Sequence, residues 1–221
     1  LNKFGISENW KATLEDKGQE YKVEDIIAYA KEHHLENLIA IDNTASATFI
    51  ENYISLAENS FDLISSNKVA NTVSFDFYKK LRKVLKDNQK EYLYETNVGA
   101  GLPLIDTIKL LHLSGENITK IKGVFSGTLS YLFNNFSVEN KKFSEVLQEA
   151  IDKGFTEPDP REDLNGNDVG RKLLILAREL DLQNEFEEIQ IQNLIPEALR
   201  EGSAADFLKR LSELDGIYQN I

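Results

Sequence analysis

The first hundred residues alternate between stretches with helical spacing of apolar side chains and short apolar runs typical of buried strands. The helical spacing predicts three helices, over residues 23–33, 47–59 and 75–85. The apolar runs predict three strands, over residues 38–41, 61–65 and 91–96. Strands that alternate with helices favour an α/β fold, in which right-handed crossovers join parallel strands.

The pattern changes at the glycine-rich turn of residues 97–103, and a second domain is expected to begin near this turn. Pro103 suits the first turn of a helix that runs to about Leu113. Further along, the spacing predicts a strand over 118–125 and helices over 128–136, 143–153, from Asp168 onward and over 204–214. The helix that begins at Asp168 is the most strongly amphipathic of these.

Composition narrows the function classes. The 221 residues are 41% hydrophobic and 28% charged, which is typical of a globular protein, and no apolar run could span a bilayer. A formal charge of −12 without a basic stripe would repel phosphate backbones, so we expect neither a membrane nor nucleic acid as a partner. The absence of cysteine excludes disulfides and thiolate metal sites. No secretory pattern opens the chain, and a cytoplasmic enzyme is expected. Because the chain begins at Leu1 and contains no methionine, we expect that a segment precedes it.

The densest candidate chemistry lies in residues 157–168, which hold five carboxylates and lead into the helix that carries Lys172. One interpretation is a solvated acidic loop in which Asp168 begins the helix. A calcium loop is rejected, because that register puts Arg161 and Lys172 at ligand positions, where cations would repel the ion. The third interpretation is catalytic: Asp168 and Lys172 lie four residues apart on one helical face, so the ammonium is held charged and can deliver a proton.

The other candidate motifs are weaker. The Gly99-Ala100-Gly101 turn fails as a dinucleotide fingerprint, because Leu104 occupies the third glycine position. Lys68 follows a predicted strand, where ligands of parallel sheets bind, although this position by itself favours a surface lysine over a functional one. The three histidines are too scattered for a metal triad. Trp10 and the other aromatic residues are expected in the core.

Several segments together resemble homoserine dehydrogenase in order and spacing. They are Asp42–Ser46, Ser66–Asn71, Thr96–Pro103, Gly123–Ser130 and Gly154–Lys172. The segment Thr156-Glu157-Pro158-Asp159-Pro160-Arg161 is specific to that family, and the region around Asn9-Trp10 is closer to the bifunctional aspartokinase–homoserine dehydrogenases. The resemblance implies NAD(P)-dependent interconversion of L-aspartate 4-semialdehyde and L-homoserine in threonine and methionine biosynthesis.

The resemblance also implies a role for individual residues of the acidic loop and the helix after it. Lys172 matches the catalytic proton donor to the aldehyde oxygen, and Asp163 matches a supporting carboxylate of the active site. Glu157 and Asp168 match residues that bind the amino-acid end of the substrate.

Cofactor and ion contacts are implied in the same way. Lys68 matches the lysine placed between nicotinamide and substrate, and Thr44 matches a cofactor contact at the end of its strand. A monovalent cation, usually sodium, is implied at Glu95, Val98, Ala100 and Leu102. The implied cofactor is NADP or NAD, and the implied assembly is a homodimer or a higher homo-oligomer.

The departures from the family lead to further expectations. The family's first strand and GxGxxG turn have no counterpart ahead of Trp10, so residues 1–95 are expected to be a partial Rossmann-like NAD(P)-binding domain without the glycine-rich loop. Residues 96–221 are expected to form an α/β catalytic and dimerisation domain. The family chain also continues beyond the last helix, and the 221 residues alone are expected to be inactive. Two alternatives remain open: a non-catalytic oligomerisation or regulatory module, and an oxidoreductase for another small aldehyde.

Overall fold

The computed structural model describes residues 8–18, 20–138 and 141–218, and their contacts divide the chain into two units. The first unit contains the residues up to Ala70 together with Asp76–Tyr94. The second unit contains Asn71–Phe75 and the residues from Glu95 onward. The sequence indicated a division near residue 95, but it did not indicate that Asn71–Phe75 belongs with the second unit.

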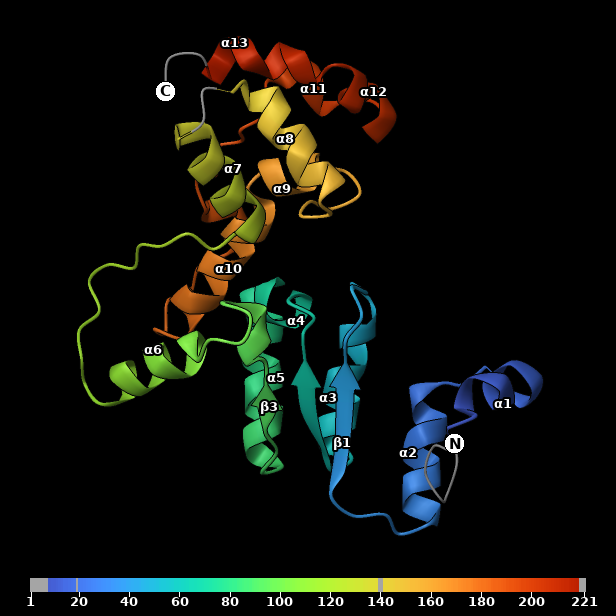
Figure 1. The fold of residues 1–221 in the computed structure, drawn as a ribbon. Coiled ribbons are helices and arrows are strands. Elements are labelled where there is room, and N and C mark those ends of the chain that lie inside the picture. The colour runs from blue at the N-terminus through green and yellow to red at the C-terminus, as the bar shows by residue number, and fades with distance from the viewer. Residues whose placement is uncertain (1–7, 19, 139–140, 219–221) are drawn as a thin grey trace. The chain divides into compact units, whose positions relative to one another are not determined.

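The first unit combines a parallel sheet with helices (Figure 1). Its strands are β1 (Leu38–Asp42), β2 (Phe61–Ser65) and β3 (Tyr92–Leu93). Its helices are α1 (Trp10–Lys17), α2 (Val23–Glu32), the 3₁₀ turn η1 (Phe49–Glu51), α3 (Asn52–Glu58) and α5 (Phe75–Asp87), whose first residue belongs to the second unit. The short helix α4 (Val69–Thr72) spans the boundary between the units. The predicted α/β fold is therefore confirmed.

The sheet has the strand order β1-β2-β3, and both pairs of neighbours are parallel. The register pairs Leu38 with Phe61 at one end of β1 and Asp42 with Ser65 at the other. The core of this unit includes Tyr53 of α3, Leu63 of β2 and Leu81 of α5, all nearly inaccessible to solvent. Because β1 and β2 end at the same level, the loops that follow them leave the same edge of the sheet.

The described residues of the second unit form helices and turns joined by loops (Figure 1). The elements up to the acidic loop are η2 (Glu95–Asn97), α6 (Leu104–Leu113), α7 (Gly127–Val138) and α8 (Phe143–Asp152). The later elements are α9 (Arg161–Leu164), α10 (Asn167–Arg178), η3 (Phe186–Glu188), α11 (Glu197–Arg200), α12 (Ala204–Lys209), η4 (Leu211–Leu214) and α13 (Asp215–Tyr218).

The apolar core of the second unit lies between α7, α8 and the C-terminal helices. The α8 residues that face it recur at helical spacing, and they are Phe143, Val146, Leu147 and Ala150. Phe143 stacks on Tyr218 of α13, with 4.1 Å between the ring centroids. The start of α8 is held by Asp215, whose carboxylate accepts the backbone N–H and the hydroxyl of Ser144. These contacts attach the C-terminal helices to α8.

Three predictions about local structure are wrong. Residues 118–125 form no strand, and the described part of the second unit holds no other strand to pair with them, so this domain is helical where it was expected to be α/β. The strand expected over 91–96 is limited to Tyr92–Leu93, because the chain turns into η2 at Glu95. Trp10 is 52% exposed and lies in α1, none of whose residues is buried. Too few apolar side chains share a face of this helix for it to pack as part of a core.

None of the helices in the described residues (8–18, 20–138 and 141–218) is long and apolar enough to cross a bilayer.

Candidate active site

The loop between α8 and α9 is shaped by Asp163, one of the predicted site residues. One oxygen of its carboxylate accepts the backbone N–H of Glu157 at 2.8 Å, and the other lies 2.9 Å from the hydroxyl of Thr128. The same hydroxyl is 2.6 Å from the carbonyl oxygen of Phe155. Asp163 therefore ties the backbone at Glu157 to the start of α7, while the Glu157 side chain remains exposed.

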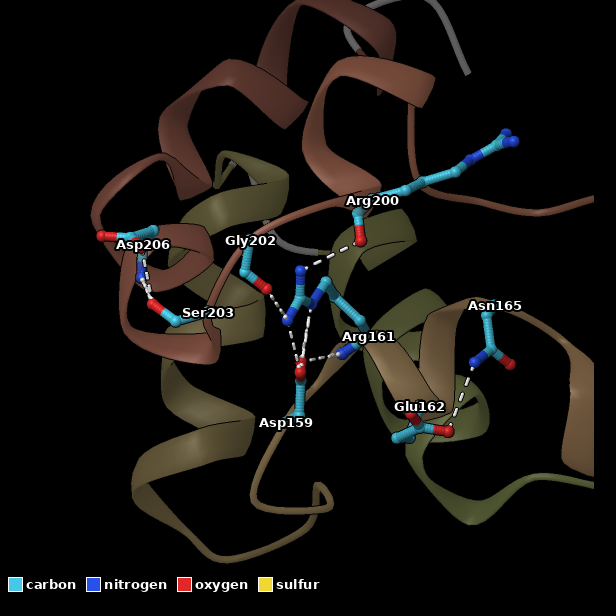
Figure 2. Close-up of polar contacts among 8 residues, drawn as sticks. All are labelled: Asp159, Arg161, Glu162, Asn165, Arg200, Gly202, Ser203 and Asp206. Atoms are coloured by element: carbon cyan, nitrogen blue, oxygen red, sulfur yellow. Dashed lines mark hydrogen bonds and ion pairs between the residues drawn. The ribbon is translucent and has the colours of Figure 1, made fainter.

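A second anchor of this loop is Arg161, whose guanidinium donates to the Asp159 carboxylate through the Nε–H and Nη2–H groups of one edge (Figure 2). Figure 2 also shows this guanidinium donating to the carbonyl oxygens of Arg200 and Gly202, at 3.1 and 3.0 Å. The hydrogen bonds from Arg161 lower the pKa of Asp159 below its usual value despite partial burial. Arg161 therefore connects the acidic loop to the chain that follows α11.

Gly166 turns the loop into α10. Its φ is +80°, a left-handed conformation that glycine adopts without penalty. A Cβ atom at this position would lie 2.8 Å from Cγ2 of Ile191, so the close approach also requires glycine. The turn is completed by the Asn165 side chain, which accepts the backbone N–H of Asn167 at 2.8 Å. Asp168 consequently lies in the first turn of α10, where a carboxylate is favoured by the helix dipole.

Lys172 lies one turn further along α10, and its side chain is only 17% exposed. Its Nζ is 2.7 Å from Oδ2 of Asp168 and donates to the backbone carbonyl of Phe125, also at 2.7 Å. The contact with Asp168 is the one that the four-residue spacing predicts. The structure thus brings together Lys172 and Asp168, with the segment before α7 as a third component.

An open hollow of about 430 Å³ lies beside this contact. Its walls come from the segment before α7, from one face of α7 and from Val169 of α10. Phe125, whose carbonyl binds Lys172, is one of the lining residues, and Val169 directly follows Asp168. The hollow is therefore lined by the residue whose carbonyl binds Lys172 and by the chain neighbour of Asp168, and it offers space for a small molecule.

The residues predicted to hold a monovalent cation lie in the turn before α6. The Glu95 carboxylate accepts the backbone N–H groups of Ile105 and Asp106 and so caps α6. Val98 is buried, and Ala100 adopts a left-handed backbone with φ +54°. The predicted donors are oxygens, which are the ligands that a hard cation prefers. Within the described residues, no three histidine, aspartate or glutamate side chains converge on one point.

Thr44 and Lys68 lie in the first unit, just after the ends of β1 and β2. The Thr44 N–H donates to Asp42, and the Ser66 hydroxyl donates to the Asn43 side chain at 3.2 Å. This edge therefore presents hydroxyl, amide and ammonium groups. Such groups fit the carboxamide and ribose of a nicotinamide nucleotide, whereas a pyrophosphate is held by a glycine-rich turn at a helix N-terminus.

The sequence did not single out two components of this site. Thr128 lies within the segment Gly123–Ser130 that carries the family resemblance, but its contact with Asp163 joins residues 35 positions apart. The Phe125 carbonyl is a backbone group, so no side-chain pattern could have revealed it. The resemblance of residues 123–130 was the one signal that pointed to this segment.

With this geometry in view, comparison with known proteins identifies the family. The sequence model of homoserine dehydrogenase matches residues 103–218, just over half of the chain. This chain belongs to the homoserine dehydrogenase family. The match includes α7, the acidic loop and α10, the elements that assemble the contacts of Lys172.

Curated homoserine dehydrogenases extend the similarity to nearly the whole chain. The bifunctional aspartokinase/homoserine dehydrogenase of Buchnera aphidicola is 41% identical over 213 residues, which are 96% of this chain and 26% of that protein. The chloroplastic bifunctional enzyme 1 of Arabidopsis thaliana is 42% identical over 218 residues, or 97% of this chain and 24% of that protein. The chain thus spans about a quarter of the length of these relatives.

Solved structures support the fold assignment. A Candida auris protein of unknown function superposes with a TM-score of 0.87 at 32% identity, over 96% of this chain and 60% of that one. A hyperthermophilic archaeal homoserine dehydrogenase in complex with NADPH superposes with a TM-score of 0.63 at 24% identity, over 78% of this chain and 54% of that one. At that identity, the second match shows a common fold.

Proposed function

We propose that this chain carries the substrate-binding and proton-donating part of a homoserine dehydrogenase, which interconverts L-aspartate 4-semialdehyde and L-homoserine with NADP or NAD. The observation that carries the proposal is the Lys172 ammonium, held by Asp168 and by the carbonyl of Phe125, a residue that lines an open hollow. This arrangement lies within the residues that match the family.

Lys172 acts as the proton donor in the reductive direction. The Lys172 ammonium has three N–H donors. Among the described residues, Asp168 and Phe125 engage it, which leaves a donor for a substrate oxygen. The nicotinamide cofactor supplies the hydride to the aldehyde carbon when it is bound. Lys172 then transfers a proton to the oxygen on which negative charge develops, and the alcohol results.

Glu157 and Asp168 bind the amino-acid end of the substrate. The exposed side chain of Glu157 and the half-exposed carboxylate of Asp168 offer negative charge to the α-ammonium of the substrate. Asp163 is a supporting residue, because its two oxygens are engaged by Thr128 and the backbone of Glu157. Its carboxylate keeps the loop in place while the other two carboxylates contact the substrate.

The remaining proposed contacts concern the cofactor, the ion and the assembly. Thr44 and Lys68 bind the nicotinamide end of the cofactor, supported by the polar edge after β1 and β2. Oxygens of Glu95, Val98, Ala100 and Leu102 hold a monovalent cation such as sodium. The proposal includes a homodimer or a higher homo-oligomer, which is supported by the exposed leucine side chains Leu110 and Leu113 of α6.

A substrate panel on the intact enzyme tests the proposed activity. We expect reduction of L-aspartate 4-semialdehyde with NADPH or NADH, with kcat/KM at least about tenfold above that for succinate semialdehyde, which lacks the amino group. The physical reason is the loss of a charge-assisted hydrogen bond to the carboxylates. The reverse oxidation of L-homoserine provides the control. Equal kcat/KM values for the two aldehydes would contradict the proposed substrate.

Two conservative variants test the roles of the carboxylates. In the intact enzyme, we expect Glu157→Gln and Asp168→Asn to raise the KM for the aldehyde by about tenfold to a hundredfold, since a charge-assisted hydrogen bond contributes about 1.5–3 kcal/mol. The KM for the cofactor should remain unchanged. Glu162→Gln is the matched control, because this exposed side chain of the same loop contacts only Asn165 at 3.4 Å among the hydrogen bonds described. If the KM for the aldehyde were unchanged in both variants, the loop would be a solvated acidic loop that does not bind the substrate.

A further inference from the structure

A buried polar network lies in the first unit, and the proposed mechanism leaves it without a role. It is formed by the side chains of Asp42, Tyr53, Ser65 and Asn67, each at most 3% exposed. Burying four polar side chains costs free energy unless each of them finds hydrogen-bond partners. The network connects the ends of β1 and β2 to the first turn of α3.

The Asp42 carboxylate is the centre of the network. Its Oδ1 accepts the backbone N–H of Thr44 at 2.8 Å. Its Oδ2 accepts the hydroxyl of Tyr53 at 2.6 Å and the side-chain amide of Asn67 at 3.1 Å. Three donors from three different segments therefore converge on one buried carboxylate.

Asn67 extends the network into both loops at this edge of the sheet. Its amide also donates to the carbonyl of Ser46 at 2.9 Å, and its side-chain oxygen accepts the N–H of Val69 at 3.0 Å. The loop after β1 and the loop after β2 are thus joined through one side chain. Lys68 lies between Asn67 and Val69, the two residues of the second loop that this last hydrogen bond joins.

The sheet itself cannot position these loops. The ladder between β1 and β2 ends at the pair of Asp42 and Ser65, and the chain then leaves the sheet. Beyond this pair, the Ser66 N–H donates to the Asp42 carbonyl and the Ser66 hydroxyl donates to the exposed Asn43 side chain. The buried ties between the two loops run through the side chains of the network. The conformation of the segments that carry Thr44 and Lys68 therefore depends on Asp42 and its partners.

We propose that Asp42 and Tyr53 are positioning residues for the cofactor, because their buried hydrogen bonds hold the two loops that present Thr44 and Lys68. This inference rests on the proposed function. Neither side chain touches the cofactor in this proposal. Both act through the backbone at Thr44 and through Asn67.

The ionisation of the two central groups is consistent with this geometry. Burial raises the pKa of Asp42, but the hydrogen bonds from Tyr53, Thr44 and Asn67 outweigh it and hold the pKa below the usual value. Burial and the hydrogen bond to Asp42 raise the pKa of Tyr53 well above its usual range. At neutral pH, the carboxylate is charged and the phenol keeps the proton that it donates.

The test uses the full-length enzyme and the variants Tyr53→Phe and Asp42→Asn. We expect the Kd for NADPH or NADH, measured by the fluorescence of the reduced nicotinamide, to rise by about tenfold in each variant, as loss of one charge-assisted hydrogen bond would cause. The KM for the aldehyde should change by less than about twofold, because the substrate carboxylates lie in the other unit. Tyr53→Phe keeps the ring and its packing, so this variant carries the test if Asp42→Asn does not fold.

Asp215→Asn is the matched control for a purely structural effect. Asp215 is 8% exposed and accepts two hydrogen bonds from Ser144, but it lies in the second unit. This variant should lower the melting temperature and leave the cofactor Kd unchanged. If Tyr53→Phe and Asp42→Asn also lower the melting temperature without changing the cofactor Kd, the network only stabilises the fold and the inference is overturned. If the unmodified enzyme binds neither cofactor, the proposed function itself has failed, and the inference fails with it.

Discussion

Replacing Lys172 with alanine in the intact enzyme is expected to lower kcat by about 10²–10⁴-fold, because the variant lacks the proton donor to the developing alkoxide. The fold should lose little stability. Asp168, which would lose its contact with Lys172, is half-exposed and remains accessible to solvent. The Kd for the cofactor should stay unchanged, since the ammonium contacts Asp168 and Phe125 rather than the edge of the sheet that carries Thr44 and Lys68. Rapid kinetics, fluorescence titration and thermal melting measure the three quantities.

Two further variants sharpen this experiment. Lys172→Arg should not restore turnover, because a guanidinium keeps its proton at any working pH. Lys153→Ala is the matched control: this exposed lysine donates to the Tyr131 hydroxyl at 2.7 Å and has no proposed part in the reaction. Its kcat should be close to that of the unmodified enzyme. Near-normal turnover of Lys172→Ala would end the proton-donor assignment, and a large loss of melting temperature would favour a structural role.

The second large effect is expected for Arg178→Met, which should destabilise the second unit by on the order of 3 kcal/mol. The Arg178 side chain is fully buried. Its guanidinium donates to the carbonyl oxygens of Asn71 and Val73, both at 2.8 Å, and of Asn184 at 3.1 Å. It also pairs with Glu185 at 3.2 Å. Methionine fills a similar volume but provides no donor, so buried carbonyl groups would lose their partners.

Urea denaturation compares this variant with Arg171→Met, which lies two turns earlier on the same helix. Arg171 is exposed and rests over the Phe186 ring at 5.1 Å, a contact that contributes about 0.5–1 kcal/mol. Arg178→Lys should recover little of the loss, because one ammonium cannot reach acceptors spread around a planar guanidinium. Equal denaturation midpoints for the two methionine variants would show that the buried hydrogen bonds contribute little to stability.

Periodicity was sufficient to predict most of the local structure. The strand over 61–65 agrees with β2 in both of its ends, and the helix expected from Asp168 begins one residue earlier in α10. The spacing of Asp168 and Lys172 also predicted their contact, because residues four apart on a helix are neighbours whatever surrounds them. Each of these features depends on interactions within a short stretch of chain.

The same reasoning failed where an apolar pattern needed a partner that the sequence does not specify. Residues 118–125 have the composition of a strand, but a strand requires a neighbour to complete its hydrogen bonds. Val124 is 73% exposed in the loop that this segment forms. Trp10 failed for a related reason, since a large aromatic side chain is buried only where other apolar groups face it.

Some features of the candidate site depend on local sequence, and others depend on contacts between residues that are distant in the chain. Residue types and spacing were enough to select the acidic loop and Lys172, and the family resemblance assigned them roles. The Phe125 carbonyl at Lys172, the Thr128 hydroxyl at Asp163 and the hydrogen bonds from Tyr53 and Asn67 to Asp42 join residues between 11 and 47 positions apart. Such pairs depend on how helices and strands pack, and packing is a property of the whole unit rather than of any short segment.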